Sequence, residues 1–174
     1  MSSPDIFVFA TKPIESPMQP FIHVAWQGNQ EWWLNSGVDT TLGLDVIKKQ
    51  RGDTITVLLN PALQDTCGQI TLTTPGVYHV SAHWLLETGT STTAVYATST
   101  IKINGVARIS SIENYFKPGG KISGTIFVDY SDLPATLILT INQINSSATN
   151  WSLKKKADFA RTDEFCWMTV AHLS

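Results

Sequence analysis

Histidine is the residue type best suited to proton chemistry near neutral pH, and two of the four histidines, His79 and His83, stand four positions apart in the segment GVYHVSAHWLL. On an extended strand this spacing is about 13 Å, from roughly 3.3 Å per residue, so both do not bind one metal ion within a single chain. One hypothesis is that three copies of the chain pack around a three-fold axis, where each histidine would form a ring of three that binds metal or makes the assembly sensitive to pH near 6.5. The alternative is that both are ordinary histidines on the face of a strand.

Motifs for catalysis are missing from the sequence. It contains no nucleophile elbow, zinc-protease helix, phosphate-binding loop or dinucleotide-binding fingerprint. An enzyme of the cupin or glycosidase type is an alternative, but a cupin needs clustered His and Glu ligands, and the four histidines show no such grouping. We therefore expect a protein that is not an enzyme, with no catalytic residues, no metal site and no cofactor.

One segment combines an aromatic residue with a basic run. Trp151 is followed by Lys154, Lys155 and Lys156, which form the only such run in the chain. A solvated loop is one interpretation of the lysines, and contact with an acidic neighbouring surface is another. Trp151 is also placed to stack on a sugar or receptor, so we treat the four residues as a possible ligand or receptor loop.

The charge of the chain limits its partners. In 174 residues, 12 Lys and Arg stand against 14 Asp and Glu, and only 15% of residues are charged, where about 25% is typical. Nucleic acid is not an expected partner, because its binding requires a dense basic face. No apolar run approaches the roughly 18 residues that span a membrane, so we expect no membrane contact.

Short apolar runs separated by turn residues are typical of an all-β protein. In the run 77–87, one face is apolar and predicted to be core, while the other face is mixed. Asn104-Gly105 is the strongest hairpin signal in the chain, and the segment 42–49 fits either a strand or one turn of helix. The remaining predicted strands are 21–26, 31–34, 54–59, 68–74, 94–103, 121–130, 135–144 and 164–173. This pattern predicts one two-sheet antiparallel sandwich over residues 21–174.

The first 20 residues differ from the rest of the chain. They contain four prolines, which favour an extended conformation, so we predict an N-terminal arm over residues 1–20. Apolar side chains in this arm are costly to leave in water, and we expect them to bind a neighbouring molecule rather than form a disordered tail. The residues that we expect to dock are Ile6, Phe7, Val8, Phe9, Ile14 and Met18.

Cys67 and Cys166 lie far apart and form neither a CxxC pair nor a metal-ligand spacing. We predict that both are free, buried thiols, because the sequence begins without a recognisable secretion signal. A protein made in the cytoplasm is the matching expectation.

The segment GQITLTTPGVYHVSAHWLL, followed by STIKINGVAR, resembles the central strands of the tumour necrosis factor and complement globular-head superfamily. The positions that carry the resemblance are Gly68, Pro75, Gly76, Tyr78 and Asn104-Gly105. SGTIFVDYSDLPATLILTINQI resembles the penultimate hairpin of that superfamily, and FCWMTVAHL resembles its closing strand. The resemblance implies a jelly roll that assembles as a homotrimer, with an interface that we expect to include Tyr78, His79, His83, Phe165 and Trp167.

The resemblance also implies a function, because similar stand-alone jelly rolls serve tailed bacteriophages as head decoration proteins and fibre tips. Neither a signal peptide nor a collagen-like stalk accompanies the domain, unlike in the secreted members. We therefore expect a homotrimeric decoration, or cement, protein on the capsid surface of a virion, with the major capsid protein as partner. The alternative is a fibre tip or adhesin module of the same fold that binds a host receptor or glycan.

Overall fold

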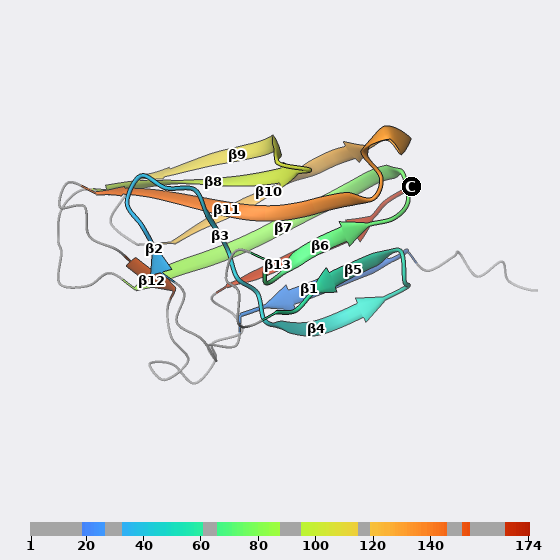
Figure 1. Cartoon of the computed structure of the whole chain (residues 1–174), viewed down its shortest axis with the longest axis horizontal. Helices are drawn as coiled ribbons and strands as arrows, with labels where there is room; N and C mark the ends of the chain where they lie inside the picture. The colour runs from blue at the N-terminus through green and yellow to red at the C-terminus, as the bar shows by residue number, and fades with distance from the viewer. Residues whose placement is uncertain are drawn as a thin grey trace, which may run out of the picture.

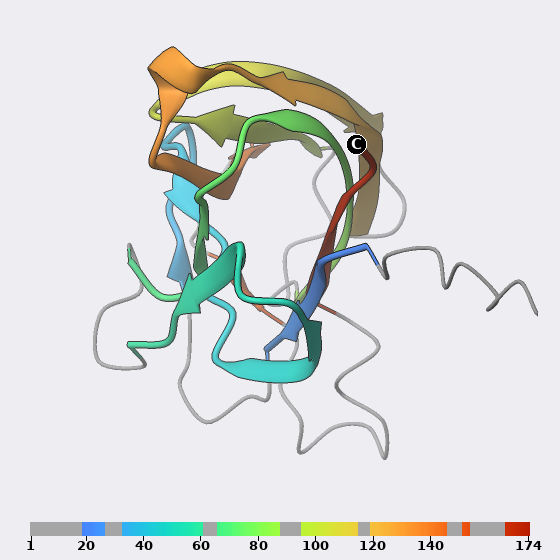
Figure 2. The same cartoon turned by 90° about the vertical axis from the view of Figure 1, so that its right-hand side faces the viewer.

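The computed structural model describes residues 19–26, 33–60, 66–87, 95–114, 119–145, 151–153 and 166–174. In this part of the chain, thirteen strands form two antiparallel sheets, and one short 3₁₀ helix lies between two of the strands. Figure 1 shows the sheets as two layers of an elongated sandwich, and Figure 2 shows them end-on, wrapped around a common interior. The predicted all-β, two-sheet architecture is confirmed.

The first sheet contains seven strands in the order β2-β12-β7-β13-β1-β4, and β10 pairs along β7. The closing strand β13 lies between β7 and β1 and pairs with both. The strand bounds are β1 Phe21–Ala25, β2 Trp33–Leu34, β4 Val46–Arg51, β7 Gly76–Glu87, β10 Gly119–Val128, β12 Trp151–Leu153 and β13 Trp167–His172.

The second sheet contains six strands in the order β5-β6-β11-β8-β9, and the short strand β3 pairs with β11. Of the segment 42–49, the second half belongs to strand β4, so the strand interpretation is the correct one. The strand bounds are β3 Thr40–Thr41, β5 Ile55–Leu58, β6 Gln69–Leu72, β8 Val95–Ile103, β9 Val106–Asn114 and β11 Ala135–Asn145.

The core lies between the sheets and is built from alternate positions of the long strands. Trp84 of β7, Ile126 of β10 and Leu137 of β11 all point inward and are buried, because successive side chains of a strand face opposite sides of the sheet. Each such side chain contributes about 1.5–3 kcal/mol by leaving water. The largest fully buried side chains are Trp26, Trp84, Tyr78, Ile22, Leu44, Ile55, Ile70, Leu72, Ile101, Ile103 and Leu137.

Two turns that the sequence indicates are present. Asn104 and Gly105 join β8 to β9 with φ of 49° and 80°, the left-handed values that a tight hairpin turn requires. Between β10 and β11, residues Tyr130–Asp132 form the 3₁₀ helix η1, and Asp129 caps it with a reciprocal capping box. Among the described residues, no helix is long and apolar enough to cross a membrane.

Candidate functional site

The outer face of the first sheet collects side chains from five strands that are far apart in the sequence. Residues on β4, β1, β13, β7 and β10 are aligned by strand pairing, and one aligned row runs Lys49, His23, Thr169, Ser81 and Ser123. We call these outward side chains the histidine face. Its members are Phe21, His23, Lys49, Arg51, Val77, His79, Ser81, His83, Leu85, Lys121, Ser123, Thr125, Phe127, Trp167, Thr169 and Ala171.

Trp167 lies between two histidines of this face. Its ring centroid is 5.6 Å from that of His23 on β1 and 6.2 Å from that of His83 on β7. Strand pairing explains the arrangement, because Trp167 is directly opposite His83, and His23 is diagonal to it on the other side. The three rings therefore form a continuous, half-buried aromatic strip across β1, β13 and β7.

Small hydroxyl residues surround the histidines. His23 Nδ1 lies 2.7 Å from Thr169 Oγ1, and His79 Nε2 lies 3.3 Å from Ser123 Oγ. Such hydroxyls donate or accept, so they satisfy an imidazole ring without adding a charge. The centre of the face is therefore built from small or ring-shaped side chains.

One edge of the histidine face is basic. Lys49 Nζ lies 5.6 Å from the centroid of the Phe21 ring, and Arg51 Cζ lies 5.5 Å from it. These cation–π contacts arise because β4 pairs with β1 so that Arg51 is opposite Phe21. At the other edge, Lys121 on β10 is opposite His83.

Carboxylates are missing from the described side chains of this surface. None of the described side chains at outward positions of β4, β1, β13, β7 and β10 is acidic. Asp45 and Asp53 flank β4 in the sequence but are not part of the strand. The described part of the face thus combines three imidazole rings with the positive charges of Lys49, Arg51 and Lys121.

Three predicted interface residues, His79, His83 and Trp167, lie on this face. Tyr78 does not: its side chain is fully buried, stacks on His172 at 4.6 Å between ring centroids, and donates to Thr74 O at 2.7 Å. A side chain with no exposed surface in the single chain has none to bury against a second one, so Tyr78 is a core residue. Phe165 lies outside the described residues.

The other predicted site residues are not brought together. Trp151 begins β12, where its backbone pairs with Leu34 of β2, but Lys154, Lys155 and Lys156 lie outside the described residues. The docking residues expected in the arm also lie outside the described residues; they are Ile6, Phe7, Val8, Phe9, Ile14 and Met18.

Sequence reasoning overlooked His23 and its neighbours Phe21 and Lys49 as part of the surface. A signal was available, since FIHVA alternates and His23 falls on the face opposite the buried Ile22 and Val24. The pairing of β1 with β13 and with β4 could not be read from the sequence, because the paired segments are about 145 and about 25 positions apart, respectively.

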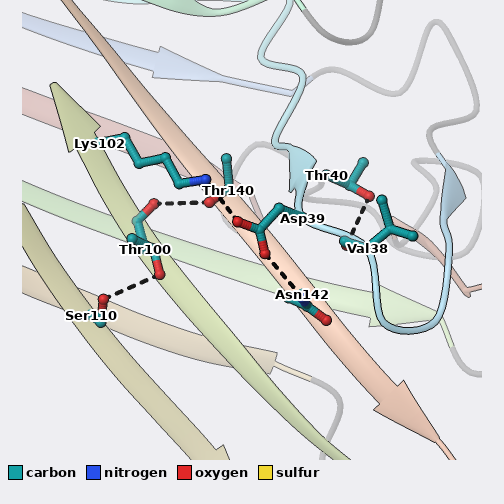
Figure 3. Close-up of polar contacts among 8 residues, drawn as sticks. All are labelled: Val38, Asp39, Thr40, Thr100, Lys102, Ser110, Thr140 and Asn142. Atoms are coloured by element: carbon teal, nitrogen blue, oxygen red, sulfur yellow. Dashed lines mark hydrogen bonds and ion pairs between the residues drawn. The ribbon is translucent and has the colours of Figure 1, made fainter. Parts of the chain in front are cut away.

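A polar network crosses the outer face of the second sheet, as Figure 3 shows. Asp39, just before β3, accepts hydrogen bonds from Lys102 Nζ at 2.7 Å and from Asn142 Nδ2 at 2.9 Å. The bonds from Lys102 and Asn142 lower the pKa of Asp39 below its ordinary value of 3.8. Asp39 thus links Lys102 of β8 to Asn142 of β11, and these two bonds hold the start of β3 against both strands.

Beside this network lies a small apolar patch formed by Tyr96 on β8, Ile112 on β9 and Ile144 on β11, which are 44%, 69% and 38% exposed. Tyr96 is directly opposite Ile144 and diagonal to Ile112, so the three side chains adjoin. No group of three or more His, Cys, Asp or Glu residues able to bind a metal ion occurs in the described ranges.

Comparisons with known proteins identify the fold and nothing finer. No protein-family model matches the sequence, and no curated protein matches it either. Among solved structures, the crystal structure of murine APRIL is similar with a TM-score of 0.56 at 9% sequence identity, over 89% of this chain and 99% of that one. APRIL is a jelly-roll protein of the tumour necrosis factor family, and this chain therefore has a tumour-necrosis-factor-like jelly-roll fold.

Proposed function

We propose that this chain is a non-enzymatic structural protein of a virion: a homotrimeric decoration protein that stabilises the head of a virus, such as a tailed bacteriophage, by bridging capsid subunits. The observation that carries the proposal is the histidine face, a sheet surface with an aromatic strip across β1, β13 and β7. In this proposal the chain acts on the virion surface, where it stabilises the capsid by burying surface against neighbouring subunits.

Self-association through this face fits its chemistry. Trp and His bury large areas at low entropic cost, and small residues such as Ser81 and Ala171 allow a second backbone to approach. Three copies related by a three-fold axis form a closed ring in which one patch meets a different patch of the next copy. The basic edge around Phe21 and the aromatic strip around Trp167 are two such patches on one chain.

Capsid docking is assigned to the arm. The chain enters the fold at a fixed point, because Gln19 Nε2 donates to Leu173 O at 2.7 Å and His172 N donates to Pro20 O at 2.9 Å. In this proposal, the part of the predicted arm 1–20 that binds a neighbouring capsid subunit is residues 1–18, which lie outside the described residues. Three arms on one trimer bind with a high effective concentration, and each added contact resists expansion of the shell.

The test is capsid binding by an arm deletion that ends at Met18 and so leaves the anchoring bonds of Gln19 and Pro20 intact. Purified protein is sedimented with capsids assembled from the major capsid protein of the virus that the proposal implies. We expect the full chain to sediment with the capsids and the deletion variant to stay in the supernatant as a trimer. A matched variant with Ile6, Phe7, Val8 and Phe9 changed to Ser is expected to lose binding too; unimpaired binding by both variants contradicts the proposal.

A receptor- or glycan-binding tip is the second candidate, and the exposed Tyr96 beside Asn142 supports it. An aromatic face next to amide and hydroxyl groups is suited to stack on a sugar ring and hydrogen-bond it. Glycan-array binding that is lost in Tyr96→Ala or Trp151→Ala favours this function. Retained binding in both variants, or no binding by the unmodified chain, argues against it.

A further inference from the structure

We propose that the trimer closes through a contact between two unlike patches, in which the basic edge around Arg51 of one copy binds an acidic turn around Asp129 of the next copy. The inference rests on the proposed function, because it names the surfaces through which the copies meet. The basic edge consists of Phe21, Lys49 and Arg51, and the acidic turn consists of Phe127, Asp129 and Tyr130. Each patch combines charge with aromatic rings, and the two charges are opposite.

The cations of the basic edge are available to a partner. Lys49 Nζ and Arg51 Cζ lie 5.6 and 5.5 Å from the centroid of the Phe21 ring, and both residues are exposed. Asp53 follows Arg51 in the turn after β4, but among the described residues no ion pair joins a carboxylate to Lys49 or Arg51. A guanidinium beside an aromatic ring is suited to a carboxylate, which it binds through two parallel hydrogen bonds.

The acidic turn is held in place by its own hydrogen bonds and by the hairpin between β8 and β9. Asp129 Oδ1 accepts a hydrogen bond from Tyr130 N, and Asp129 N donates to Asp132 Oδ2 at 3.2 Å. Asn104 Nδ2 donates to Asp132 O at 2.7 Å, and Arg108 Nη2 lies 3.6 Å from Asp132 Oδ1. Asp132 is therefore paired, whereas within the described ranges Asp129 has no ion pair and is exposed. Its carboxylate is left for a partner, and a turn that is already fixed loses little entropy on binding.

Aromatic rings flank the carboxylate of Asp129. Phe127 and Tyr130 are 64% and 79% exposed, among the highest values for large apolar side chains in the described residues. Exposed rings of this size are typical of interaction sites. Against the next copy they bury area on the half-buried ring of Phe21, while the carboxylate meets the cations of the basic edge.

The two patches lie at the same end of the first sheet and on its opposite edges. Figure 1 shows η1 and the end of β4 at one end of the sandwich. Phe127 is opposite Val77 on β7. The row of Phe21 crosses β7 at His79, two positions or about 7 Å further along. A rotation about a three-fold axis that follows the strands changes no height along them, so patches at similar heights meet in the next copy and close the ring.

The distance across the sheet excludes the same contact within one chain. The strand order β10-β7-β13-β1-β4 separates the two edges by about 19 Å, at roughly 4.8 Å between neighbouring strands. An ion pair needs its charged atoms within about 4 Å of each other. The partner of the basic edge is therefore the turn of a second copy.

The experiment is a charge exchange, read as the mass of the protein by gel filtration with light scattering at pH 8. The unmodified chain is expected at three times its mass of 19.1 kDa. Arg51→Glu and Asp129→Arg each place like charges in the contact, and each is expected to reduce the mass three-fold, to that of the monomer. The double variant Arg51→Glu, Asp129→Arg restores opposite charges and is expected to recover the trimer.

Two further variants separate the charge of Asp129 from its role as a cap. Asp129→Asn keeps an oxygen that caps η1 and removes only the charge, so we expect the protein concentration at which the trimer dissociates to rise about ten-fold. Asp53→Arg changes an exposed aspartate in another turn and is the matched control, expected to leave the trimer intact. Near-ultraviolet circular dichroism of every variant is expected to match that of the unmodified chain.

The outcomes distinguish this contact from the trimer itself. Trimers in both single variants overturn the contact and leave the proposed trimer standing. A folded double variant that stays monomeric also overturns the contact, as does an Asp129→Asn variant that dissociates like the unmodified chain. An unmodified chain that is monomeric overturns both the contact and the trimer.

Discussion

At the scale of single residues, Cys67 and Cys166 illustrate how packing decides reactivity. Both are free and fully buried, as predicted from their spacing. Burial raises the pKa of both thiols, and for Cys166 it raises it to about 12, although the thiol donates to Leu85 O. The thiolate is the reactive form, so these groups are protected by their environment rather than by a disulfide.

We expect iodoacetamide at pH 8 to alkylate Cys166 in the folded protein about a thousand-fold more slowly than it alkylates free cysteine, because so little thiolate is present. Mass spectrometry of timed samples gives the rate. Unfolding in urea is the control and is expected to restore rapid labelling of both cysteines. Complete labelling of the folded protein within minutes would show that Cys166 is not buried as described.

Gly76 is a second residue whose role depends on its surroundings. Its φ is +143°, and a Cβ added there would collide with Ser174 O and His172 Nε2. Gly76→Ala is expected to lower the free energy of unfolding by roughly 2–5 kcal/mol, from backbone strain and overpacking together. Gly105→Ala, with φ of +80° and no atom within 4 Å of the added Cβ, is the control and should cost about 1 kcal/mol. Equal losses in urea unfolding curves would contradict the close approach at Gly76.

At the scale of elements, the short strand β3 is held by charge as well as by its pairing with β11. The carboxylate of Asp39 binds Lys102 and Asn142, and its pKa is lowered chiefly by the hydrogen bond from Lys102. A carboxyl group with a lowered pKa in the folded state stabilises the fold above its ordinary pKa of 3.8, and that contribution disappears as the pH falls through the lower folded value. Because Asp39 is half exposed, the bridge contributes no more than about 1 kcal/mol.

The substitution Lys102→Met is expected to raise the pKa of Asp39 toward its ordinary value. It is also expected to lower the free energy of unfolding slightly at pH 7 but not in strong acid. A side-chain carboxyl NMR titration measures the pKa, and urea unfolding at the two pH values measures the stability. Lys121→Met removes a lysine from the other sheet and serves as the control. An unchanged titration of Asp39 in Lys102→Met would show that the ion pair does not form.

At the scale of the whole molecule, we expect an arginine substitution to have opposite effects on trimer formation on the two outer sheet faces. Ser81 lies at the centre of the histidine face, whereas Thr98 lies on the outer face of the second sheet between Ile112 and Asn142. Ser81→Arg places a large cation in the proposed interface and is expected to yield a monomer by light scattering at pH 8, with an unchanged fold by circular dichroism. Thr98→Arg is the matched control and is expected to leave the trimer intact; trimers in both variants would move the interface elsewhere.

The likeness to murine APRIL, at 9% identity, concerns the fold of the whole molecule. Folds of this kind are used for unrelated functions, so the function has to be argued from surfaces and tested there. The decoration, tip and trimer proposals differ in which surface they use: the arm, the Tyr96 patch or the histidine face. Each experiment above changes one of these surfaces and leaves the others intact.

The sequence by itself determined most of the long strands and the buried side of several of them, but it predicted no strand at β3, β9 or β12. Alternation of apolar and polar residues made the inward positions of β7, β10 and β11 recognisable, and Asn104-Gly105 marked its hairpin, because both signals are local. The two free cysteines followed from their spacing. The resemblance in Gly76 to Trp84 indicated the jelly roll that the structural comparison shows.

Only the tertiary structure decided which strands are neighbours and hence what each outer face contains. Tyr78 and His79 are adjacent in the sequence, yet one is fully buried and the other is exposed on the opposite side of the sheet. His23 joins His83 and Trp167 only because β13 inserts between β1 and β7. Such pairing depends on closing long loops and packing a shared core, and no local pattern encodes it.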